Sequence, residues 1–271
     1  MRYRLIAVDI DGTLLNPARE LEEETVRAAK KAMEAGAYFV LSSGRMPQAL
    51  KSIAERLGVN APAVCFNGGA VVDVMTGKTL FSTPVDLSLA REIAVFGEEK
   101  GLYMHAFIHG GYIAPCFTDM TQDYQTMVGI KANVVNGNIS EYLDEAPMKL
   151  LVLDKPEECA RILPVLQEKF GDRANIMPSQ KHIIECVGKQ TSKARALEFV
   201  RQMLDIPYEE TCAFGDGMND LEMLLWSAHP YVMDNASDAL KKASDRFVIA
   251  PSNADLGVAR VLMKEACGID L

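Results

Sequence analysis

Short apolar runs that each end in a polar, glycine-containing segment constrain the fold of this chain more than any other feature. Leu5–Val8 is entirely apolar, and residues 37–41 and 61–65 repeat the pattern. Near-continuous apolar runs of this length predict strands that are buried on both faces. Helical patterns over residues 21–35 and 48–57 separate the runs. This alternation indicates a parallel sheet with helices on both of its faces.

The middle of the chain departs from this alternation, which marks a change of architecture. After Pro84 the predicted elements are a helix over residues 87–100, a strand–turn–strand over 103–115, a less regular segment through Asn138, a strand over 148–154, a helix over 156–171 and a strand over 181–187. This order predicts a separate α+β unit inserted into the first domain.

After Gly188 the first pattern resumes. The predicted elements there are a helix over residues 194–204, a strand, turn and helix over 211–225, and short strands over 230–236 and 246–252. We therefore expect an α/β protein with a Rossmann-like doubly wound parallel-sheet core and an inserted α+β domain. The expected parts, with boundaries near Pro84 and Gly188, are residues 1–83, 84–187 and 188–271.

Charge and hydropathy narrow the classes of partner. The net charge of −9 at pH 7 argues against nucleic acid or an anionic membrane surface as the main partner. The apolar run near the N-terminus breaks at Asp9. No run approaches the roughly 18 apolar residues of a membrane helix, so we expect neither a signal peptide nor a membrane span.

The cysteines indicate a reducing compartment, because they are scattered and form no Cys-x-x-Cys pair. We expect reduced, mostly buried thiols in a cytoplasmic protein, although a reactive cysteine stays open. The six residues are Cys65, Cys116, Cys159, Cys186, Cys212 and Cys267.

Four predicted strand ends carry the polar clusters in which the chemistry must lie, because ligands of open parallel sheets bind beyond the carboxyl ends of the strands. The clusters lie at residues 9–13, 42–45, 67–69 and 215–220. Together they bring up to four carboxylates to one crevice, and like charges packed so closely favour binding of a hard divalent cation such as Mg²⁺. The carboxylates are Asp9, Asp11, Asp216 and Asp220.

The alternation of a strand refines this expectation for the first cluster. Residues i and i+2 point the same way, so Asp9 and Asp11 both face the crevice if the strand extends that far. Gly12 then allows a turn and lets backbone N–H groups approach a ligand. The alternative is that these acids cap turns or helix starts, as Asp and Asn often do. Caps do not require two acids on one strand.

Three of these segments resemble the motifs of one enzyme superfamily. "DIDGT" at residues 9–13 is similar to D-x-D-G-T, the first motif of the haloacid dehalogenase-like (HAD) hydrolases. "SSGR" at residues 42–45 resembles their second motif, and "GDGMND" at residues 215–220 their fourth, G-D-x-x-N-D. With an insertion between the second and third motifs, nearly the whole chain resembles the Cof-type phosphatases, the branch with a C2 cap.

The resemblance implies a role for each motif residue. Asp9 is expected to be the nucleophile that forms an aspartyl-phosphate, and Asp11 the general acid and base. The implied Mg²⁺ ligands are Asp9, the main-chain carbonyl of Asp11, and Asp216, with Asp220 binding directly or through water. The implied phosphate-binding residues are Ser43, Gly44, Lys193 and Asn219.

The third motif of the family is a lysine, for which "VGKQTSKA" offers Lys189 and Lys193. The family places this lysine before a small residue at a helix start, which matches Lys193. A cation in the first turn opposes the helix dipole, and local rules are often broken at functional sites. The alternative for Lys193 is a solvated surface lysine, and we assign that role to Lys189.

The chain departs from the family pattern in two segments, with "MDNA" where G-N-A is common and "DLGV" where E-D-G-V is common. Asn67 and Asn235 lie at strand ends and either shape the site or form turns. Arg45 either touches substrate or pairs with an acid. The inserted domain is expected to select the substrate, and its candidate residues are His105, His109, Tyr112, Tyr124 and His182.

The leading functional hypothesis is a Mg²⁺-dependent phosphatase acting on small phosphomonoesters, such as sugar or cofactor phosphates. A phosphotransferase or phosphomutase would share the same aspartyl-phosphate, so it remains an alternative. A non-catalytic phosphoryl-binding or phospho-accepting module is disfavoured by Asp11, because storing phosphate on an aspartate needs no general acid two residues on. The expected partner is a small phosphorylated metabolite, and the sequence does not reveal the oligomeric state.

Overall fold

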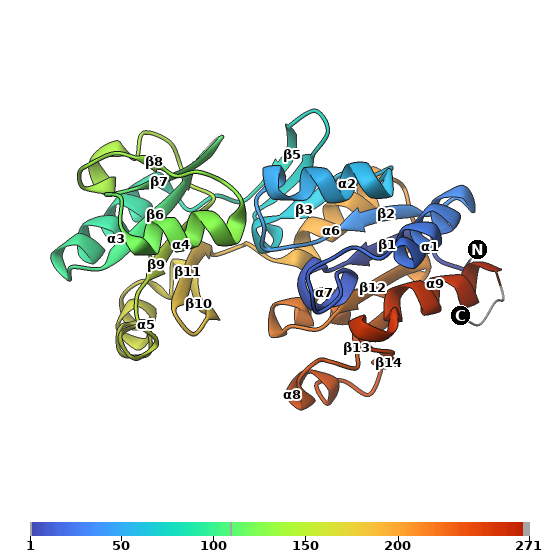
Figure 1. Cartoon of the computed structure of the whole chain (residues 1–271). Helices are drawn as coiled ribbons and strands as arrows, with labels where there is room; N and C mark the ends of the chain where they lie inside the picture. The colour runs from blue at the N-terminus through green and yellow to red at the C-terminus, as the bar shows by residue number, and fades with distance from the viewer. Residues whose placement is uncertain (1, 109, 268–271) are drawn as a thin grey trace. The chain divides into compact units, whose positions relative to one another are not determined.

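The computed structural model describes residues 2–108 and 110–267, and the chain divides into two compact units (Figure 1). The core unit comprises residues 1–81 and 192–271, and the cap unit comprises residues 82–191. The two ends of the cap segment meet, because the hydroxyl groups of Thr83 and Thr191 share a hydrogen bond of 3.0 Å. No helix in the described part of the chain is long and apolar enough to cross a membrane.

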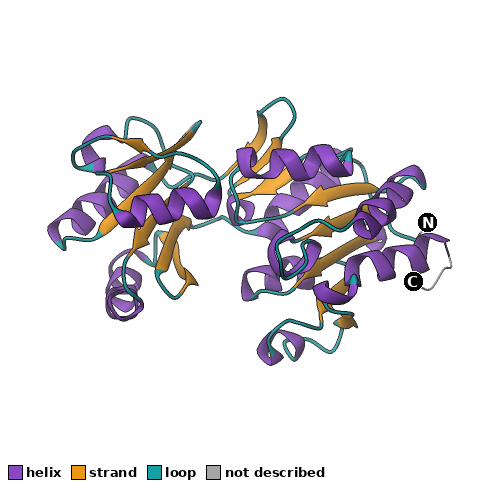
Figure 2. Cartoon of the chain, viewed as in Figure 1, coloured by secondary structure: helices purple, strands orange, loops and turns teal. Residues whose placement is uncertain are grey.

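A five-stranded parallel sheet forms the centre of the core unit (Figure 2). Its strand order is β14 (Val248–Ala250), β13 (His229–Met233), β12 (Thr211–Gly215), β1 (Leu5–Val8) and β2 (Tyr38–Leu41). Val8, the last residue of the central strand, pairs with Phe214 on β12 and Leu41 on β2. The predicted parallel α/β core is confirmed, and its buried strands match the apolar runs of the sequence.

Helices cover both faces of this sheet. They are α1 (Glu23–Glu34), α2 (Lys51–Leu57), α6 (Lys193–Met203), α7 (Leu221–Trp226), α8 (Asp238–Lys241) and α9 (Gly257–Cys267). Leu5 and Ala7 of β1 share a hydrophobic cluster with side chains of α6 and α7. Ile6 and Val8 alternate with them and point to the opposite face. Helices α1 and α9 pack side by side in the core unit (Figure 1).

The third apolar run of the sequence forms a strand outside this sheet. β3 (Ala63–Cys65) pairs antiparallel with β4 (Ala70–Asp73) in a three-stranded sheet that β5 (Lys78–Ser82) completes. A single parallel bridge between Ser42 and Val64 links β3 to the chain beyond β2. The prediction that residues 61–65 form a further strand of the parallel sheet was wrong, because the chain reverses through Gly68 into a hairpin without a crossover helix.

The cap unit contains a six-stranded mixed sheet with two helices on one face. Its strand order is β10 (Ala174–Gln180), β11 (Ile183–Gly188), β9 (Lys149–Leu153), β6 (Tyr103–Ile108), β7 (Gly111–Ala114) and β8 (Asn133–Val134). Helices α3 (Leu87–Glu99) and α5 (Pro156–Phe170) pack on side chains such as Met104 and Val152. These residues form the hydrophobic core of the unit.

The segment that the sequence predicts as irregular contains a helix, α4 (Asp119–Val128), and strand β8. Strand β10 was also not predicted. Thr118 caps the N-terminus of the helix, and its side chain and that of Thr121 form a reciprocal capping box. Only Thr121 and Tyr124 are buried in α4, although Met120, Tyr124, Met127 and Val128 recur at helical spacing in its sequence, so the prediction of an irregular segment missed an available pattern.

Three tyrosine rings enclose His105 on the cap sheet. The ring centroids of Tyr103, Tyr112 and Tyr124 lie 5.0 to 5.3 Å from that of His105. The imidazole is fully buried, and neither ring nitrogen has a hydrogen-bond partner among the described residues. Burial lowers the pKa of His105 to about 4, so the ring is neutral at pH 7.

Candidate active site

Strands β1 and β12 end side by side and bring three carboxylates together. Asp9 follows β1, and its N–H donates to the carbonyl of Phe214 on β12 over 3.0 Å. Asp216 follows β12, and Asp220 lies one turn further along. Oxygen atoms of Asp9, Asp216 and Asp220 all lie within 4.8 Å of one another. We call these three residues the carboxylate cluster.

The turn after β1 brings Asp216 into this cluster. The N–H groups of Leu14 and Leu15 bond to the carbonyls five residues earlier, over 3.1 and 3.0 Å, and Gly12 has a φ of +89°. A Cβ atom on Gly12 would lie 2.2 Å from Oδ2 of Asp216, so no larger residue fits without displacing that carboxylate. Oγ1 of Thr13 donates to Oδ1 of Asp216 over 2.7 Å.

The turn after β12 fixes Asp220. Its Oδ2 accepts the backbone N–H groups of Asp216 and Gly217 over 3.1 and 2.9 Å. Its Oδ1 accepts a hydrogen bond of 2.5 Å from Nζ of Lys193. The Asp220 side chain is 1% exposed, so each of its oxygen atoms is used inside the protein.

Lys193 is the first residue of α6, and its ammonium group lies between two carboxylates. Nζ donates to Oδ1 of Asp9 over 2.6 Å, to Oδ1 of Asp220, and to the carbonyl of Ser42 over 3.1 Å. The side chain is completely buried. The interpretation of Lys193 as a solvated surface lysine is therefore wrong. Lys189, by contrast, is exposed and lies in the cap unit.

The electrostatics of the cluster favour an additional cation. Burial raises the pKa of Asp9 well above its usual range, and repulsion from Asp220 adds to this, against the attraction of Lys193. Burial also raises the pKa of Asp216 to about 6. Burial by itself would lower the pKa of Lys193, but attraction to Asp220 and Asp9 outweighs it and raises the pKa. Three carboxylates and one ammonium leave two negative charges, which a divalent cation would balance.

Asp11 is not a member of the carboxylate cluster. Its carboxylate accepts hydrogen bonds from Nε and Nη2 of Arg45, over 2.8 and 2.6 Å, and from Nη2 of Arg19 over 3.2 Å. Burial works against the charged form, but the bonds to Arg45 outweigh it and lower the pKa of Asp11. Strand β1 ends at Val8, so strand alternation does not bring Asp11 beside Asp9. Arg45 pairs with an acid, one of the two roles that the sequence left open.

The remaining sequence-predicted residues lie at neighbouring strand ends. Ser43 is buried, and its Oγ accepts the N–H of Arg45 over 3.2 Å. A Cβ atom on Gly44 would lie 2.9 Å from Nδ2 of Asn67. Nδ2 of Asn219 donates to Oδ1 of Asn67 over 3.2 Å. Asn67 thus connects the second and fourth motif segments. The sequence alone did not distinguish this role of Asn67 from a role in a turn.

The other residues singled out in the sequence lie at the turn after β1, in the cap unit and among the cysteines. Nδ2 of Asn235 donates to the carbonyl of Gly12 over 2.8 Å, which supports the turn beside Asp216. In the cap unit, Tyr112 and Tyr124 are buried with His105, and His182 is exposed. His109 lies outside the described residues. The described cysteines are free thiols and are all buried except Cys116; the side chain of Cys267 lies outside the description.

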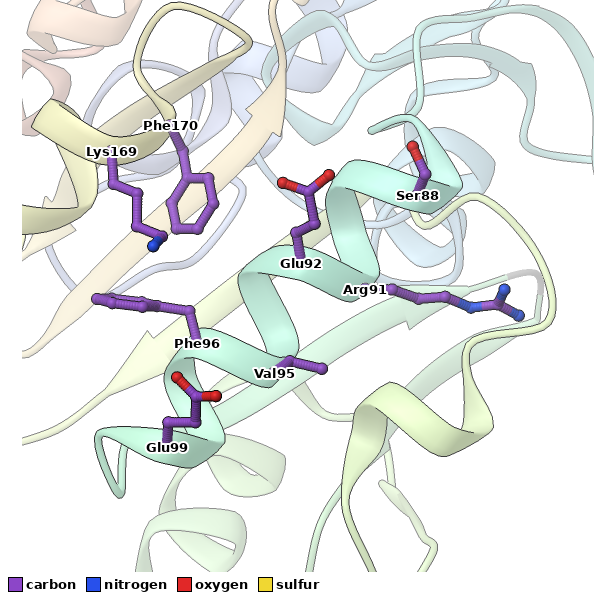
Figure 3. Close-up of a pocket in the computed structure, with 8 residues that line it drawn as sticks. All are labelled: Ser88, Arg91, Glu92, Val95, Phe96, Glu99, Lys169 and Phe170. Atoms are coloured by element: carbon purple, nitrogen blue, oxygen red, sulfur yellow. The ribbon is translucent and has the colours of Figure 1, made fainter.

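The cap unit has a cavity of its own, of about 560 Å³, between α3 and α5. Figure 3 shows Glu92, Phe96 and Glu99 projecting from α3 beside Lys169 and Phe170 of α5. Nζ of Lys169 lies 4.9 Å from the centroid of the Phe96 ring. None of the sequence-predicted site residues lines this cavity.

Known proteins are similar to this chain over nearly its whole length. The family model for haloacid dehalogenase-like hydrolases matches residues 6–262. A Streptococcus pyogenes protein provisionally named a phosphatase is 29% identical over 269 residues, which cover 97% of this chain and 98% of that protein. The Bacillus subtilis 5-amino-6-(5-phospho-D-ribitylamino)uracil phosphatase is 28% identical over 273 residues, covering 95% and 96%. A crystal structure from Thermotoga maritima matches with a TM-score of 0.87 at 28% identity, covering 97% of each chain.

Proposed function

Because this chain belongs to the haloacid dehalogenase-like hydrolases and is a phosphoric monoester hydrolase, we propose that it hydrolyses small phosphorylated metabolites with Mg²⁺ through an aspartyl-phosphate at Asp9. The observation that carries the proposal is the buried carboxylate cluster with Lys193 in contact with Asp9 and Asp220. The Bacillus subtilis relative, whose name specifies a phosphorylated ribityl compound, supports a small phosphomonoester as substrate.

The residues present fit a hard divalent cation. The cluster offers carboxylate oxygens only, which Mg²⁺ prefers, and its excess of two negative charges matches one such ion. We propose that Asp9, the carbonyl of Asp11 and Asp216 would hold the ion, with Asp220 as a further or water-mediated ligand. When bound, the ion would neutralise charge on the phosphoryl oxygens.

In the proposed first step, an oxygen atom of Asp9 forms a bond to phosphorus. The bond from phosphorus to the leaving oxygen breaks, and Asp11 gives that oxygen a proton, which requires that substrate binding weaken the contacts with Arg45 and Arg19 that favour the ionised carboxylate. In the second step, Asp11 takes a proton from water, the water oxygen bonds to phosphorus, and the bond to Asp9 breaks. Lys193 holds the Asp9 carboxylate through Oδ1 in the meantime.

The phosphoryl group would be bound by groups that follow strands β2 and β12 and by the first residue of α6. We propose that Ser43 and Asn219 donate hydrogen bonds to its oxygen atoms, and that the backbone of Gly44 and the charge of Lys193 contribute. The contact between Asn219 and Asn67 supports this assignment, because it holds one donor in place.

The proposal is tested with p-nitrophenyl phosphate and with ³²P-labelled substrate. Hydrolysis should stop with EDTA and return with Mg²⁺. Acid quenching during turnover should trap hydroxylamine-sensitive label on the wild-type protein and none on Asp9→Asn, whose turnover should fall by about 10⁴-fold or more. Label on Asp9→Asn, or metal-independent turnover, would refute the proposal. Transfer of label to a second metabolite would favour the phosphotransferase alternative.

A further inference from the structure

Two asparagines from the C-terminal part of the core unit hold the turn that follows β1. Nδ2 of Asn235 donates to the carbonyl of Gly12 over 2.8 Å, and Nδ2 of Asn253 donates to the carbonyl of Leu15 over 2.7 Å. The asparagines are also joined to each other, because the N–H of Asn253 donates to Oδ1 of Asn235 over 3.0 Å. A continuous chain of three hydrogen bonds therefore spans the turn from Gly12 to Leu15.

The hydrogen bonds within the turn use other carbonyls. The N–H of Leu14 donates to the carbonyl of Asp9, and the N–H of Leu15 donates to the carbonyl of Ile10. The carbonyls of Gly12 and Leu15 are instead bound from outside the turn. A primary amide both donates and accepts, so a pair of asparagines can bind two carbonyls and each other. Their amides thus fasten the turn to the rest of the core unit.

The core sheet brings both asparagines to this position. Asn235 follows β13 and Asn253 follows β14, and the last residues of these strands, Met233 and Ala250, pair in register. The N–H of Asp234 also donates to the carbonyl of Ala250 over 2.9 Å. Because the carboxyl ends of parallel strands meet at the same edge of a sheet, both asparagines lie at the edge where β1 ends.

The loop that carries Asn253 is closed and strained. The N–H of Gly257 donates to the carbonyl of Ser252 over 3.0 Å, and a Cβ atom on Gly257 would collide with the carbonyl of Pro251. Leu256 has a φ of +59°, a left-handed conformation that is unfavourable for leucine and persists only where the surrounding structure enforces it. The loop thus holds the backbone of Asn253 in a fixed place.

The turn in its own right determines where Asp216 lies. Oγ1 of Thr13 donates to Oδ1 of Asp216, and the absence of a side chain on Gly12 leaves room for that carboxylate. Because a peptide group is planar, fixing the carbonyl of Gly12 also fixes the backbone at Thr13. A displaced turn would therefore move one of the carboxylates of the cluster.

We propose that Asn235 and Asn253 are positioning residues for the metal site: by holding the turn they keep Thr13 against Asp216 and maintain the geometry with which the carboxylate cluster binds Mg²⁺. The inference rests on the proposed phosphatase function. The sequence left open whether Asn235 shapes the site or forms a turn, and the proposal assigns it both roles. The effect of the asparagines on hydrolysis passes through the affinity for Mg²⁺, so it should diminish when Mg²⁺ is saturating.

The first test is calorimetric titration of Asn235→Ala, Asn253→Ala and the double variant with Mg²⁺. Each single substitution should weaken binding by about three- to tenfold, as expected for the loss of one or two neutral hydrogen bonds. The two asparagines act through one chain of hydrogen bonds, so their effects should not be independent. The double variant should therefore bind Mg²⁺ more tightly than the product of the two single effects predicts.

Asn60→Ala is the matched control for Asn235→Ala. Nδ2 of Asn60 donates to the carbonyl of Ala37 over 2.8 Å, and its Oδ1 accepts the N–H of Phe39 over 3.0 Å, at the amino end of β2. The substitution therefore removes the same two kinds of hydrogen bond at the opposite end of the sheet. It should lower the midpoint of urea unfolding about as much as Asn235→Ala does, but change the affinity for Mg²⁺ by less than about twofold.

Turnover of p-nitrophenyl phosphate gives the second readout. At subsaturating Mg²⁺, Asn235→Ala should lose turnover by about the same factor as affinity, and saturating Mg²⁺ should restore kcat to within about twofold of wild type. Rescue by the metal is not expected of a merely structural defect.

Failure of this inference is distinguishable from failure of the phosphatase proposal. A wild-type protein that binds Mg²⁺ without turnover would refute the phosphatase proposal alone, and the titrations would still decide the role of the asparagines. The inference is overturned if the wild-type protein binds no Mg²⁺, or if Asn235→Ala and Asn253→Ala bind it as tightly as Asn60→Ala. It is also overturned if the two single effects simply multiply, or if saturating Mg²⁺ leaves the loss of kcat unchanged.

Discussion

Replacing His105 with phenylalanine should make the cap unit more resistant to acid. The imidazole is fully buried among tyrosine rings, and burial lowers its pKa from 6.5 to about 4. In the unfolded chain the imidazole titrates near its ordinary pKa of 6.5, whereas in the folded chain it titrates near 4. Between pH 6.5 and pH 4 the unfolded state therefore binds more protons than the folded state. Stability therefore falls as pH decreases. At about 1.4 kcal/mol per pKa unit, the loss amounts to about 3 kcal/mol.

His105→Phe removes this titration and the unpartnered ring nitrogens. Removing a buried unsatisfied polar group stabilises by about 1–3 kcal/mol, and fitting a larger ring costs a similar amount. The free-energy difference from wild type at pH 7 therefore combines opposing effects. The test therefore measures how the free-energy difference between His105→Phe and wild type changes with pH. The difference should grow in favour of the variant by about 3 kcal/mol between pH 7 and pH 4.

Hydrogen exchange measured by mass spectrometry on peptides from β6 and β9 reports the cap unit directly. The single tryptophan, Trp226, lies on α7 of the core unit, so its fluorescence reports the other unit and should not follow the change. His182→Gln, at an exposed site, is the matched control and should stay within about 0.5 kcal/mol of wild type. A difference between His105→Phe and wild type that stays constant from pH 7 to pH 4 would refute the reasoning.

Three further predictions concern the carboxylate cluster. Gly12→Ala should displace Asp216 and weaken Mg²⁺ binding measured by calorimetry, whereas Gly36→Ala, with a similar positive φ and open space around it, should not. Lys193→Met should lower the free energy of unfolding in urea by about 3–5 kcal/mol, because it leaves buried carboxylates unpaired; an unchanged midpoint would contradict this. Asp216→Asn should weaken Mg²⁺ binding about tenfold or more while the circular dichroism spectrum stays that of wild type.

The parallel core could be predicted because four of its five strands, β1, β2, β12 and β13, are almost entirely buried, and its turns are rich in glycine. Leu5–Val8 was predicted to the residue, and Gly36 ends α1 with a φ of +95° as expected. The start of α6 was predicted one residue late, at Ala194, although Lys193 was expected in its first turn, where a cation opposes the helix dipole. The contacts of the Lys193 ammonium group with Asp9 and Asp220 compensate for this unfavourable position in the folded chain.

What the sequence did not reveal depends on long-range contacts. Helix α4 faces the cap sheet with Tyr124, the one buried member of the apolar row formed by Met120, Tyr124, Met127 and Val128. The direction of Asp11 depends on Arg45, which is 34 residues away in the chain. Leu225 of α7 is 42% exposed although it is apolar, while Met223 of the same helix is buried. Spacing within a short helix does not determine which neighbours cover it.

The hydrogen bond between Thr83 and Thr191 has a consequence for how such a protein diversifies. Because the two ends of the cap segment meet, the whole segment could be exchanged for another at one place in the gene without moving either end of the core chain. Every residue of the carboxylate cluster is encoded outside that segment. A chimaera with a foreign insert should thus keep the proposed phosphoryl chemistry of the parent.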